Sequence, residues 1–269
     1  MKKNTITNLI IGSEGFIGKS FCEYLINQGE EVIRFDIKID KKDDGRKFIF
    51  DFTNIDRIYF LAWDVGGAKY LYKEDAQLQQ LNWNMELLTN IMPQLQKCKK
   101  PFLFISSQLA EETDTVYGVT KRLGEIWTKI LEGTYIRQWN VYGPLESITE
   151  RSHVISDFVV QALKTKEIKI MTTGEEKRQF IHIDDVCRAW HMALQQKIKG
   201  THDVTSFEWI KIIDIANMIA KTTGATVIPG EIIGSTPITP IKGKIIGWSP
   251  EVSLEDGLEK MINELKEKI

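Results

Sequence analysis

The sequence predicts an α/β protein with a doubly wound parallel sheet, followed by a smaller C-terminal α/β region. Two observations support this class. Short apolar runs alternate with amphipathic stretches through the first half of the chain, and the apolar runs are rich in Ile and Phe without a polar face. Strands covered by helices on both faces have this composition, and regular alternation of strand and helix favours a parallel sheet.

Five strands are expected in the first 107 residues, together with helical patterns between and after them. The connection before the fourth strand, TNID, is too short for a normal crossover helix, so we expect one face of the sheet to lack a covering helix there. The first and last helical patterns end at Gly29 and Gly133, a residue type common directly after a helix. The expected strands are 7–12, 30–36, 46–52, 57–63 and 101–107, and the expected helices are 16–29, 76–98 and 117–133.

We expect residues 1–143 to form the first domain and residues 144–269 to supply most of a second region, with 179–204 returning to the first sheet. The chain has 269 residues, of which 42% are hydrophobic and 27% are charged. This composition suits a soluble globular protein with one large domain or two unequal domains.

Charge, apolar runs and cysteines exclude several kinds of protein. The formal net charge is −2, which gives no general attraction to nucleic acid or acidic membranes. No apolar run approaches the ~20 residues of a membrane-spanning helix, and no cleavage site follows the N-terminal apolar run. The three cysteines and four histidines lack disulfide or metal-ligand spacing. We expect a cytoplasmic protein with free thiols and without a metal, a nucleic acid partner or a membrane partner.

A glycine-rich turn, IIGSEGFIGKS, separates the first expected strand from the first helix and contains Gly12, Gly15 and Gly18. Residues without a Cβ atom permit a tight turn and let the backbone approach a pyrophosphate, whose charge then lies at the helix N-terminus. The alternative is a turn that only packs a helix against a strand. Taken with the acidic residue described next, the turn indicates a Rossmann-type dinucleotide-binding domain.

Asp36 ends the second expected strand, about 20 residues after the glycines, where a carboxylate accepts hydrogen bonds from both ribose hydroxyls of adenosine. A 2′-phosphate would meet this negative charge, so we expect NAD rather than NADP, although Arg34 and Lys38 nearby leave NADP open. Asp51 and Phe52 follow the third expected strand. They either close over the adenine or form a strand-ending turn, and the sequence does not decide between these.

Tyr117 and Lys121 are four residues apart in a helical pattern and therefore share one helical face. A nearby ammonium is expected to lower the pKa of the phenol from about 10 towards the range of a general base. Ser106 and Ser107 end the strand just before this helix, at the sheet edge where such folds place functional groups. The alternative is a surface pair, which the position of the serines disfavours.

These motifs resemble the extended short-chain dehydrogenase/reductase family, and within it the NAD-dependent epimerase/dehydratase group that acts on nucleotide sugars. The resemblance extends over almost the whole chain, in family order. Besides the glycine turn and the Ser, Tyr and Lys set, it rests on FLAW after the fourth strand, Asn82 in QLNWNMELL, YIRQWNVYGP at 135–144, KRQFIHIDDV at 177–186, GTHDVTSFEWIKIIDIANMIA, and IIGWSPEVSLEDGLEKMI.

The resemblance implies a catalytic set of Ser107, Tyr117 and Lys121. Tyr117 would be the general acid/base, Lys121 would also contact the nicotinamide ribose, and NAD would carry the hydride. The implied cofactor contacts are Gly12, Gly15, Phe16, Ile17, Gly18, Asp36, Asp51, Phe52, Leu61, Ala62, Asn82, Ser106, Tyr117 and Lys121.

Asn140 and Arg178 match family positions near the substrate diphosphate. Ser107 would contact the sugar of the same substrate. An amide donor and a guanidinium are suitable partners for phosphate oxygens. The alternatives are a turn residue for Asn140 and a solvated loop arginine for Arg178. Asp184 or Asp185 is expected to cap the helix that follows His182.

The residues after Ser107 bear on the reaction. Family 4,6-dehydratases carry an acidic pair there, but this chain has Gln108 and Leu109. Epimerases that act at carbon 3 or 5 use a Cys and a His, and Leu109 occupies the position of that Cys. Glu111 and Glu112 are expected to face solvent. Dehydration and ring-carbon enolisation are therefore disfavoured.

We expect reversible hydride transfer at a sugar hydroxyl carbon, C4, and a 4-epimerase ahead of the alternatives. These are a 4-dehydrogenase, a 4-ketoreductase of a 4-keto-6-deoxy sugar, a 4,6-dehydratase, an enzyme acting on a hydrophobic alcohol, and a non-catalytic NAD-binding regulator. The loops that hold the nucleobase are expected within 144–176 and 225–248. A homodimer is expected through the helical segments 78–92 and 117–131, which carry Trp83 and Trp127. The alternative is that these apolar side chains face the sheet.

Overall fold

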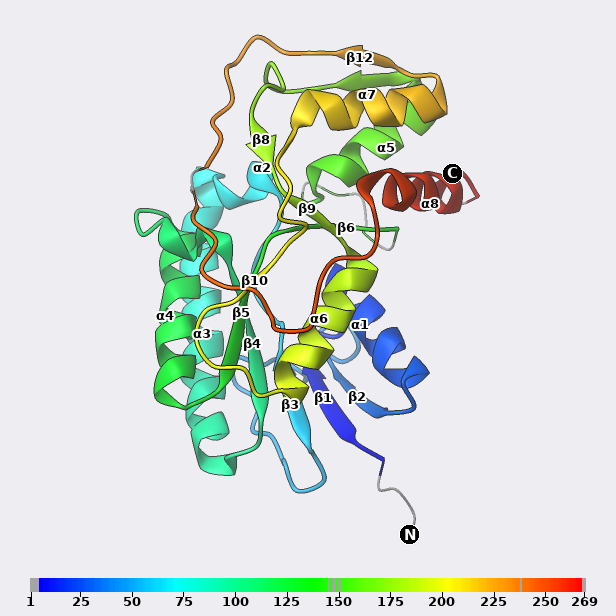
Figure 1. The fold of residues 1–269 in the computed structure, drawn as a ribbon. Helices are drawn as coiled ribbons and strands as arrows, with labels where there is room; N and C mark the ends of the chain where they lie inside the picture. The colour runs from blue at the N-terminus through cyan, green and yellow to red at the C-terminus, as the bar shows by residue number, and fades with distance from the viewer. Residues whose placement is uncertain (1–4, 145, 147–148, 150, 238, 268–269) are drawn as a thin grey trace.

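The computed structural model describes residues 5–144, 146, 149, 151–237 and 239–267 (Figure 1). Its main sheet has six strands, all paired in parallel, in the order β10-β5-β4-β3-β1-β2. The predicted fold class, a Rossmann-type doubly wound sheet, is confirmed. The strands are β1 (Thr7–Ile11), β2 (Glu31–Phe35), β3 (Arg57–Phe60), β4 (Phe102–Ser107), β5 (Thr134–Gln138) and β10 (Asp203–Val204).

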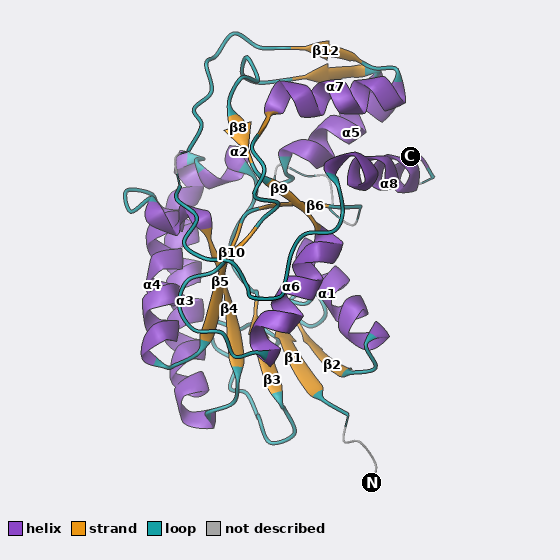
Figure 2. Ribbon diagram, in the orientation of Figure 1, coloured by secondary structure: helices purple, strands orange, loops and turns teal. Residues whose placement is uncertain are grey.

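Helices cover both faces of this sheet (Figure 2). One face packs against α3 (Glu74–Cys98) and α4 (Val116–Ile130), and the other against α1 (Phe16–Asn27) and α6 (Ile183–Gln195). Side chains alternate across a strand, so neighbours in β1 enter different cores. Leu9 and Ile11 join the core under α3, whereas Ile10 joins the core under α1 and α6.

The segment 46–52 is not a strand, so that prediction is wrong, and the sheet ends at β2. Its alternating phenylalanines do point to one side: Phe48 lies 4.8 Å from Phe35 and 4.9 Å from Phe50 between ring centroids. Its backbone, however, is bonded by side chains of α3, since Gln94 accepts from the Phe50 N–H at 2.9 Å and donates to the Phe48 carbonyl at 2.9 Å. The apolar run predicted a strand, but the backbone pairs with side chains of α3 rather than with a neighbouring strand.

The second region lies beyond the carboxyl ends of the main strands (Figure 1). Helices α5 (Val154–Thr165), α7 (Ile212–Thr223) and α8 (Leu254–Lys266) share one core there. The remaining elements are short. They are α2 (Ala68–Leu71), η1 (Gln108–Glu111), and the strand pairs β6 (Asn140–Tyr142) with β9 (Phe180–His182), β7 (Glu167–Lys169) with β12 (Thr226–Ile228), and β8 (Lys177–Arg178) with β11 (Ile210–Lys211).

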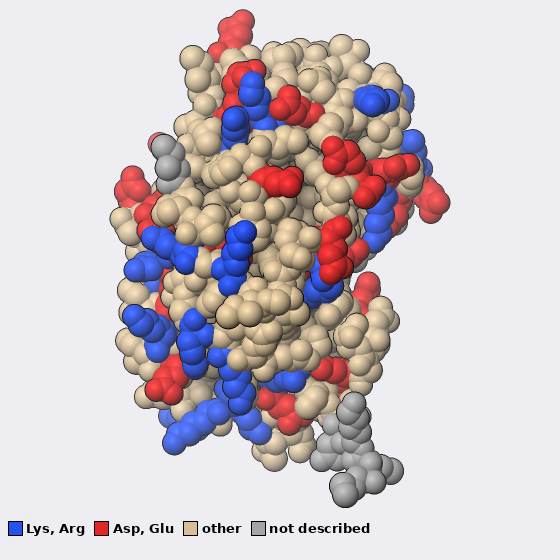
Figure 3. All heavy atoms as spheres, viewed as in Figure 1, with Lys and Arg blue, Asp and Glu red and all other residues tan. Residues whose placement is uncertain are grey.

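Acidic and basic side chains both occur across the face of the molecule shown in Figure 3. Cys22, Cys98 and Cys187 are free thiols. None of the helices in the described part of the chain is long and apolar enough to cross a membrane.

Candidate active site

A cavity of about 890 Å³ lies between the carboxyl edge of the main sheet and the second region. Ligands of doubly wound sheets bind at this edge, and the volume is at the upper end for ligand sites. Fourteen of the seventeen predicted site residues line it: Gly12, Gly15, Phe16, Ile17, Gly18, Asp36, Leu61, Ala62, Ser106, Ser107, Tyr117, Lys121, Asn140 and Arg178.

The turn between β1 and α1 requires glycine at two positions. Gly12 has φ +97°, and a Cβ atom there would lie 2.5 Å from the Ala62 nitrogen. A Cβ atom on Gly18 would lie 2.3 Å from the Gly12 carbonyl oxygen. Gly15 is the N-cap of α1, and a Cβ atom there would be no closer than 3.5 Å to any heavy atom outside its chain neighbours and the helix backbone. It would therefore fit, and it would project into the space before the helix. This cradle, with no side-chain cap on the first N–H groups, fits a pyrophosphate.

Asp36 lies directly after β2, and its carboxylate is held by two backbone N–H groups. Glu14 N–H and Lys38 N–H each donate to it at 2.9 Å. The two cations that left NADP open are both engaged by Glu14. Arg34 donates to its carboxylate at 3.1 Å, and the Lys38 ammonium donates to its carbonyl at 3.3 Å. The surroundings of Asp36 therefore suit a ribose with free hydroxyls better than a phosphorylated one.

Asp51 and Phe52 do not line the cavity, which differs from the cofactor contact expected for them. Asp51 is exposed and accepts hydrogen bonds from the Thr53 N–H and hydroxyl at 2.9 and 2.6 Å. These bonds fit the second interpretation of this residue, a turn. The segment 43–46 lines the cavity instead, because the chain after β2 runs along α3 rather than adding a strand. No sequence signal placed that segment at the site.

Asn82 also lies away from the cavity and is exposed, whereas Asn84 is fully buried on the same helix. The Asn84 side chain accepts from the Asp64 N–H at 2.8 Å and donates to the Asp64 carbonyl at 3.2 Å. It thereby fixes the chain just after β3. The helical periodicity of this segment could have identified Asn84 as buried, since it is four residues from both Gln80 and Leu88, which are also buried.

The predicted catalytic residues meet at the cavity from two elements. Ser107 ends β4 and caps η1, with its hydroxyl accepting from the Leu109 N–H at 3.2 Å and donating to Gln108 at 3.1 Å. Tyr117 and Lys121 lie on the first turns of α4 and line the same cavity. The structure therefore brings together the three residues that the sequence placed on one strand end and one helix.

Burial sets the pKa values of this pair, and it acts against the expected charge effect. It raises the pKa of Tyr117 to about 12, while a hydrogen bond with Ser107 opposes the rise. It also lowers the pKa of Lys121 to about 7. The Lys121 ammonium donates to the Ile105 carbonyl at 2.7 Å and lies 4.1 Å from the Trp63 ring centroid, but 5.8 Å from that of Tyr117. The expected lowering of the phenol pKa by Lys121 is therefore wrong.

Asn140 on β6 and Arg178 on β8 line the cavity on the side of the second region. The Asn140 amide donates to the Gln179 carbonyl at 2.8 Å, and the Arg178 guanidinium donates to the Ser235 carbonyl at 2.9 Å. The cap of α6 is the His182 ring, which accepts from the Asp184 N–H at 3.3 Å, rather than an aspartate. Within the two loops expected to hold the nucleobase, residues 145, 147–148, 150 and 238 lie outside the described residues.

The predicted site also lacks Asp64, Arg151 and Glu112, which are among the charged residues that line the cavity. Asp64 is 5% exposed and accepts from Arg151 at 2.7 Å and from the Tyr70 hydroxyl at 2.9 Å. Its position directly after FLAW, at a strand end, was the available signal. Glu112 was expected to face solvent, but it lines the cavity, 3.4 Å from the Tyr72 hydroxyl, because η1 turns the chain back towards the site.

A turn restricted to glycine, a carboxylate after the second strand and a tyrosine–lysine pair at the sheet edge define a dinucleotide-dependent enzyme of the Rossmann class. The chain belongs to the NAD dependent epimerase/dehydratase family, which matches residues 8–205. The predicted resemblance and the predicted cofactor, NAD, are confirmed. It is thus an NAD-dependent enzyme whose relatives modify nucleotide sugars.

Two curated relatives illustrate the family. A dTDP-4-dehydro-6-deoxy-D-allose reductase of Streptomyces sp. is 24% identical over an alignment that covers 81% of each chain. A CDP-abequose synthase of Salmonella muenchen is 24% identical and covers 95% of this chain and 96% of its own.

Two solved structures share the fold. UDP-glucose 4-epimerase of Thermotoga maritima, solved with UDP-glucose, has a TM-score of 0.78 at 21% identity and covers 98% of this chain and 99% of its own. An NAD-dependent NDP-hexosamine 5,6-dehydratase of tunicamycin biosynthesis has a TM-score of 0.82 at 16% identity and covers 98% of both. Enzymes of different reaction types thus have this architecture.

Proposed function

We propose that this enzyme transfers a hydride reversibly at carbon 4 of the sugar in a nucleotide-diphosphate sugar and acts as a 4-epimerase. One observation carries the proposal. Ser107, Tyr117 and Lys121 line one cavity, while the positions directly after Ser107 hold Gln108 and Leu109 rather than an acid and a base. A single proton relay suffices for oxidation of a hydroxyl to a ketone and for its reduction on either face.

In the proposed reaction, Tyr117 accepts the proton of the sugar hydroxyl while Ser107 hydrogen-bonds the same oxygen. Bound NAD supplies the hydride acceptor and the positive charge of its oxidised nicotinamide ring. With a pKa of about 12, Tyr117 is protonated at neutral pH. The positive charge of the nicotinamide ring would favour the phenolate and so lower the barrier to proton removal. Lys121 would hold the nicotinamide ribose.

We further propose that residues 1–143 bind NAD and that 144–269 supply most of the substrate contacts. Asn140 and Arg178 line the cavity together with Tyr117, and their N–H groups are suitable donors to a diphosphate. A guanidinium held by backbone carbonyls at 2.8 and 2.9 Å is partly ordered before substrate binds, which reduces the entropy lost on binding.

A 4-ketoreductase is the second candidate. Two Streptomyces relatives, each 24% identical, are dTDP-4-dehydro-6-deoxy-D-allose reductases, and the same proton relay serves reduction of a 4-keto sugar. The two candidates differ only in whether the keto sugar stays bound between the two hydride transfers.

The test is incubation with a panel of nucleotide sugars while NADH absorbance and sugar products are followed. A C4 epimer without net NADH supports the epimerase. Stoichiometric NADH would instead show a dehydrogenase, and NADH consumption with a 4-keto sugar would show a reductase. Tight NAD binding without turnover of any substrate would contradict the proposal and favour a regulator.

We also propose a homodimer through the outer face of α3 and α4. Both helices expose large apolar side chains there: Leu78, Leu81, Leu123, Ile126 and Ile130. Trp83, which the sequence predicted for this surface, instead lines the cavity, with the Arg46 guanidinium 4.3 Å from its ring centroid. Leu78 is 69% exposed and Ile130 71%, which is unusual for single helices unless another surface covers them. A monomeric mass in solution at micromolar concentration would contradict this assembly.

A further inference from the structure

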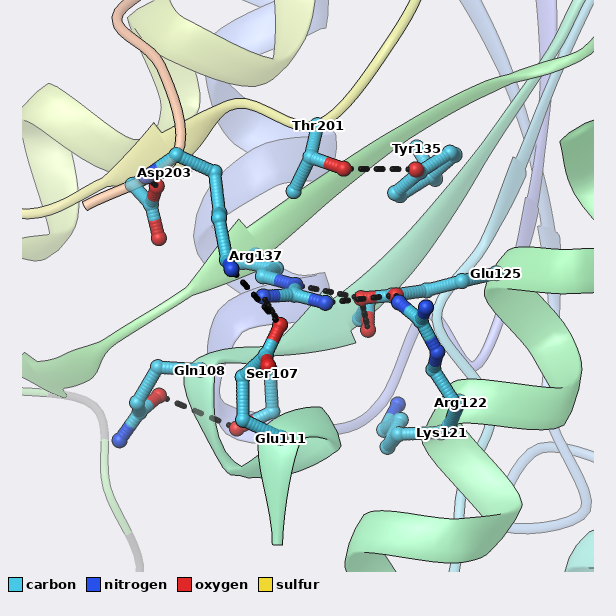
Figure 4. Close-up of polar contacts among 12 residues, drawn as sticks. Ser107, Gln108, Glu111, Lys121, Arg122, Glu125, Tyr135, Arg137, Thr201 and Asp203 are labelled. Atoms are coloured by element: carbon cyan, nitrogen blue, oxygen red, sulfur yellow. Dashed lines mark hydrogen bonds and ion pairs between the residues drawn. The ribbon is translucent and has the colours of Figure 1, made fainter. Parts of the chain in front are cut away.

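Arg137 on β5 is 1% exposed and lies at the centre of a network of ion pairs (Figure 4). Its Nε and one terminal nitrogen donate to the two carboxylate oxygens of Glu125 at 2.7 and 2.9 Å. Its other terminal nitrogen donates to the carboxylate of Glu111. We call these three residues the Arg137 clamp.

The clamp joins the elements that carry the predicted catalytic set. Glu125 lies one turn after Lys121 on α4, and it also accepts a bond from the Ser106 hydroxyl at 2.6 Å. Glu111 belongs to η1, the turn that the Ser107 hydroxyl caps. Through Arg137, the turn that begins at Ser107 is therefore tied to the helix that carries Lys121.

The clamp also affects where the Lys121 side chain points. Lys121 and Glu125 have the four-residue spacing at which a lysine and a glutamate on a helix usually pair. Here both Glu125 oxygens are bonded by Arg137, and one of them also by Arg122 at 2.8 Å. The Lys121 ammonium donates instead to the Ile105 carbonyl, close to the cavity.

Stability alone does not account for such a network. Two buried charges lose much of their hydration, and apolar residues of similar volume are often as stabilising as a buried ion pair. A two-pronged bond between guanidinium and carboxylate does, however, fix both partners in one orientation. In catalysis, a displacement of about 1 Å costs roughly a hundredfold in rate, so this orientation matters most where it holds reacting groups.

We propose that Arg137, Glu125 and Glu111 are positioning residues, which hold Ser107 in register with Tyr117 and Lys121 for proton transfer. The proposal rests on the proposed function, because it takes Ser107, Tyr117 and Lys121 as the reacting set. None of the three clamp residues lines the cavity, so they act only through the residues that they hold.

The test compares Glu111→Gln with the matched variant Glu251→Gln. Glu111 is the partly exposed end of the clamp, so its substitution leaves the buried pair of Arg137 and Glu125 in place. Glu251 ends a similar but more exposed network elsewhere, since Arg188 joins it to Asp185, a carboxylate that is 1% exposed. Full-length proteins are compared by amide hydrogen exchange of residues 107–112, by NAD affinity, and by kcat and KM.

For Glu111→Gln we expect hydrogen exchange in 107–112 to become about tenfold faster and kcat to fall about tenfold, the scale of one charged hydrogen bond. KM and NAD affinity should stay within about twofold, and Glu251→Gln should match the wild type in all four measurements. If Glu111→Gln leaves kcat unchanged, or lowers NAD affinity as much as kcat, the positioning role is wrong.

Failure of the proposed function would look different. In that case the wild type itself turns over no nucleotide sugar, and hydrogen exchange alone decides on the clamp. Unchanged exchange in Glu111→Gln would then overturn the clamp, whereas faster exchange would support its hold on the turn after Ser107.

Discussion

On the cofactor side of the cavity, the turn between β1 and α1 is held by backbone contacts, whereas the substrate side is held by side chains from distant segments. Gly12 and Gly18 have no room for a Cβ atom. Arg178 instead bonds a carbonyl 57 residues away, and Arg151 bonds a carboxylate 87 residues away. The cofactor side is therefore preformed by close backbone contacts, within the turn at Gly18 and against Ala62 at Gly12, while the substrate side depends on how loops of the second region pack.

The two sides meet at Tyr117, and its substitution should have the largest effect. In Tyr117→Phe the relay loses its proton acceptor, so we expect kcat to fall about 10² to 10⁴-fold, the usual contribution of a general acid or base. NAD affinity, measured by fluorescence or calorimetry, should change less than about threefold. Undiminished turnover with the correct substrate would remove the basis for the whole site.

Two glycine variants separate the fold of the cofactor side from its ligand. Gly15→Ala places a methyl group in the cradle, so we expect NAD affinity to fall about a hundredfold without loss of stability. Gly18→Ala places its methyl group 2.3 Å from the Gly12 carbonyl oxygen, so we expect a lower melting temperature as well. Equal melting temperatures for the two variants would contradict the steric account of Gly18.

Lys121 gives a prediction for pH. Its pKa falls from 10.5 to about 7 on burial, so between these values the unfolded chain binds more protons than the folded chain. The free energy of unfolding then rises with pH in this window. Between pH 7 and 9 the NAD-free wild type should gain roughly 2 kcal/mol more than Lys121→Met in urea unfolding. Parallel pH profiles would show that Lys121 is not buried as described.

Arg178→Gln tests the substrate side alone and should have the smallest effect. The amide keeps a donor but loses the charge, so we expect KM for the nucleotide sugar to rise about tenfold. Affinity for NAD should not change, because Arg178 lies in the second region. The opposite result, weaker NAD binding with an unchanged KM, would assign Arg178 to the cofactor.

Prediction from the sequence was most accurate where neighbouring residues decide the structure. The glycine turn, Asp36 after the second strand, Ser107 at a strand end and the four-residue spacing of Tyr117 and Lys121 are local features, and each lies at the cavity. Predictions failed where a segment bonds to residues far along the chain. The apolar segment 46–52 was expected to be a strand, yet its backbone bonds to Gln94, more than 40 residues away.

By itself, the sequence determined the parallel fold, the glycine turn, the family and the choice of NAD, because these depend on backbone conformation and on the order of short motifs. Only the tertiary structure decided which side chains are buried together. Burial reversed the expected pKa shift of Tyr117. Packing also made Asn84, rather than Asn82, the buried asparagine of α3, and it placed Arg137 between Glu125 and Glu111. The physical reason is that desolvation and long-range ion pairs depend on packing between segments, which no single segment encodes.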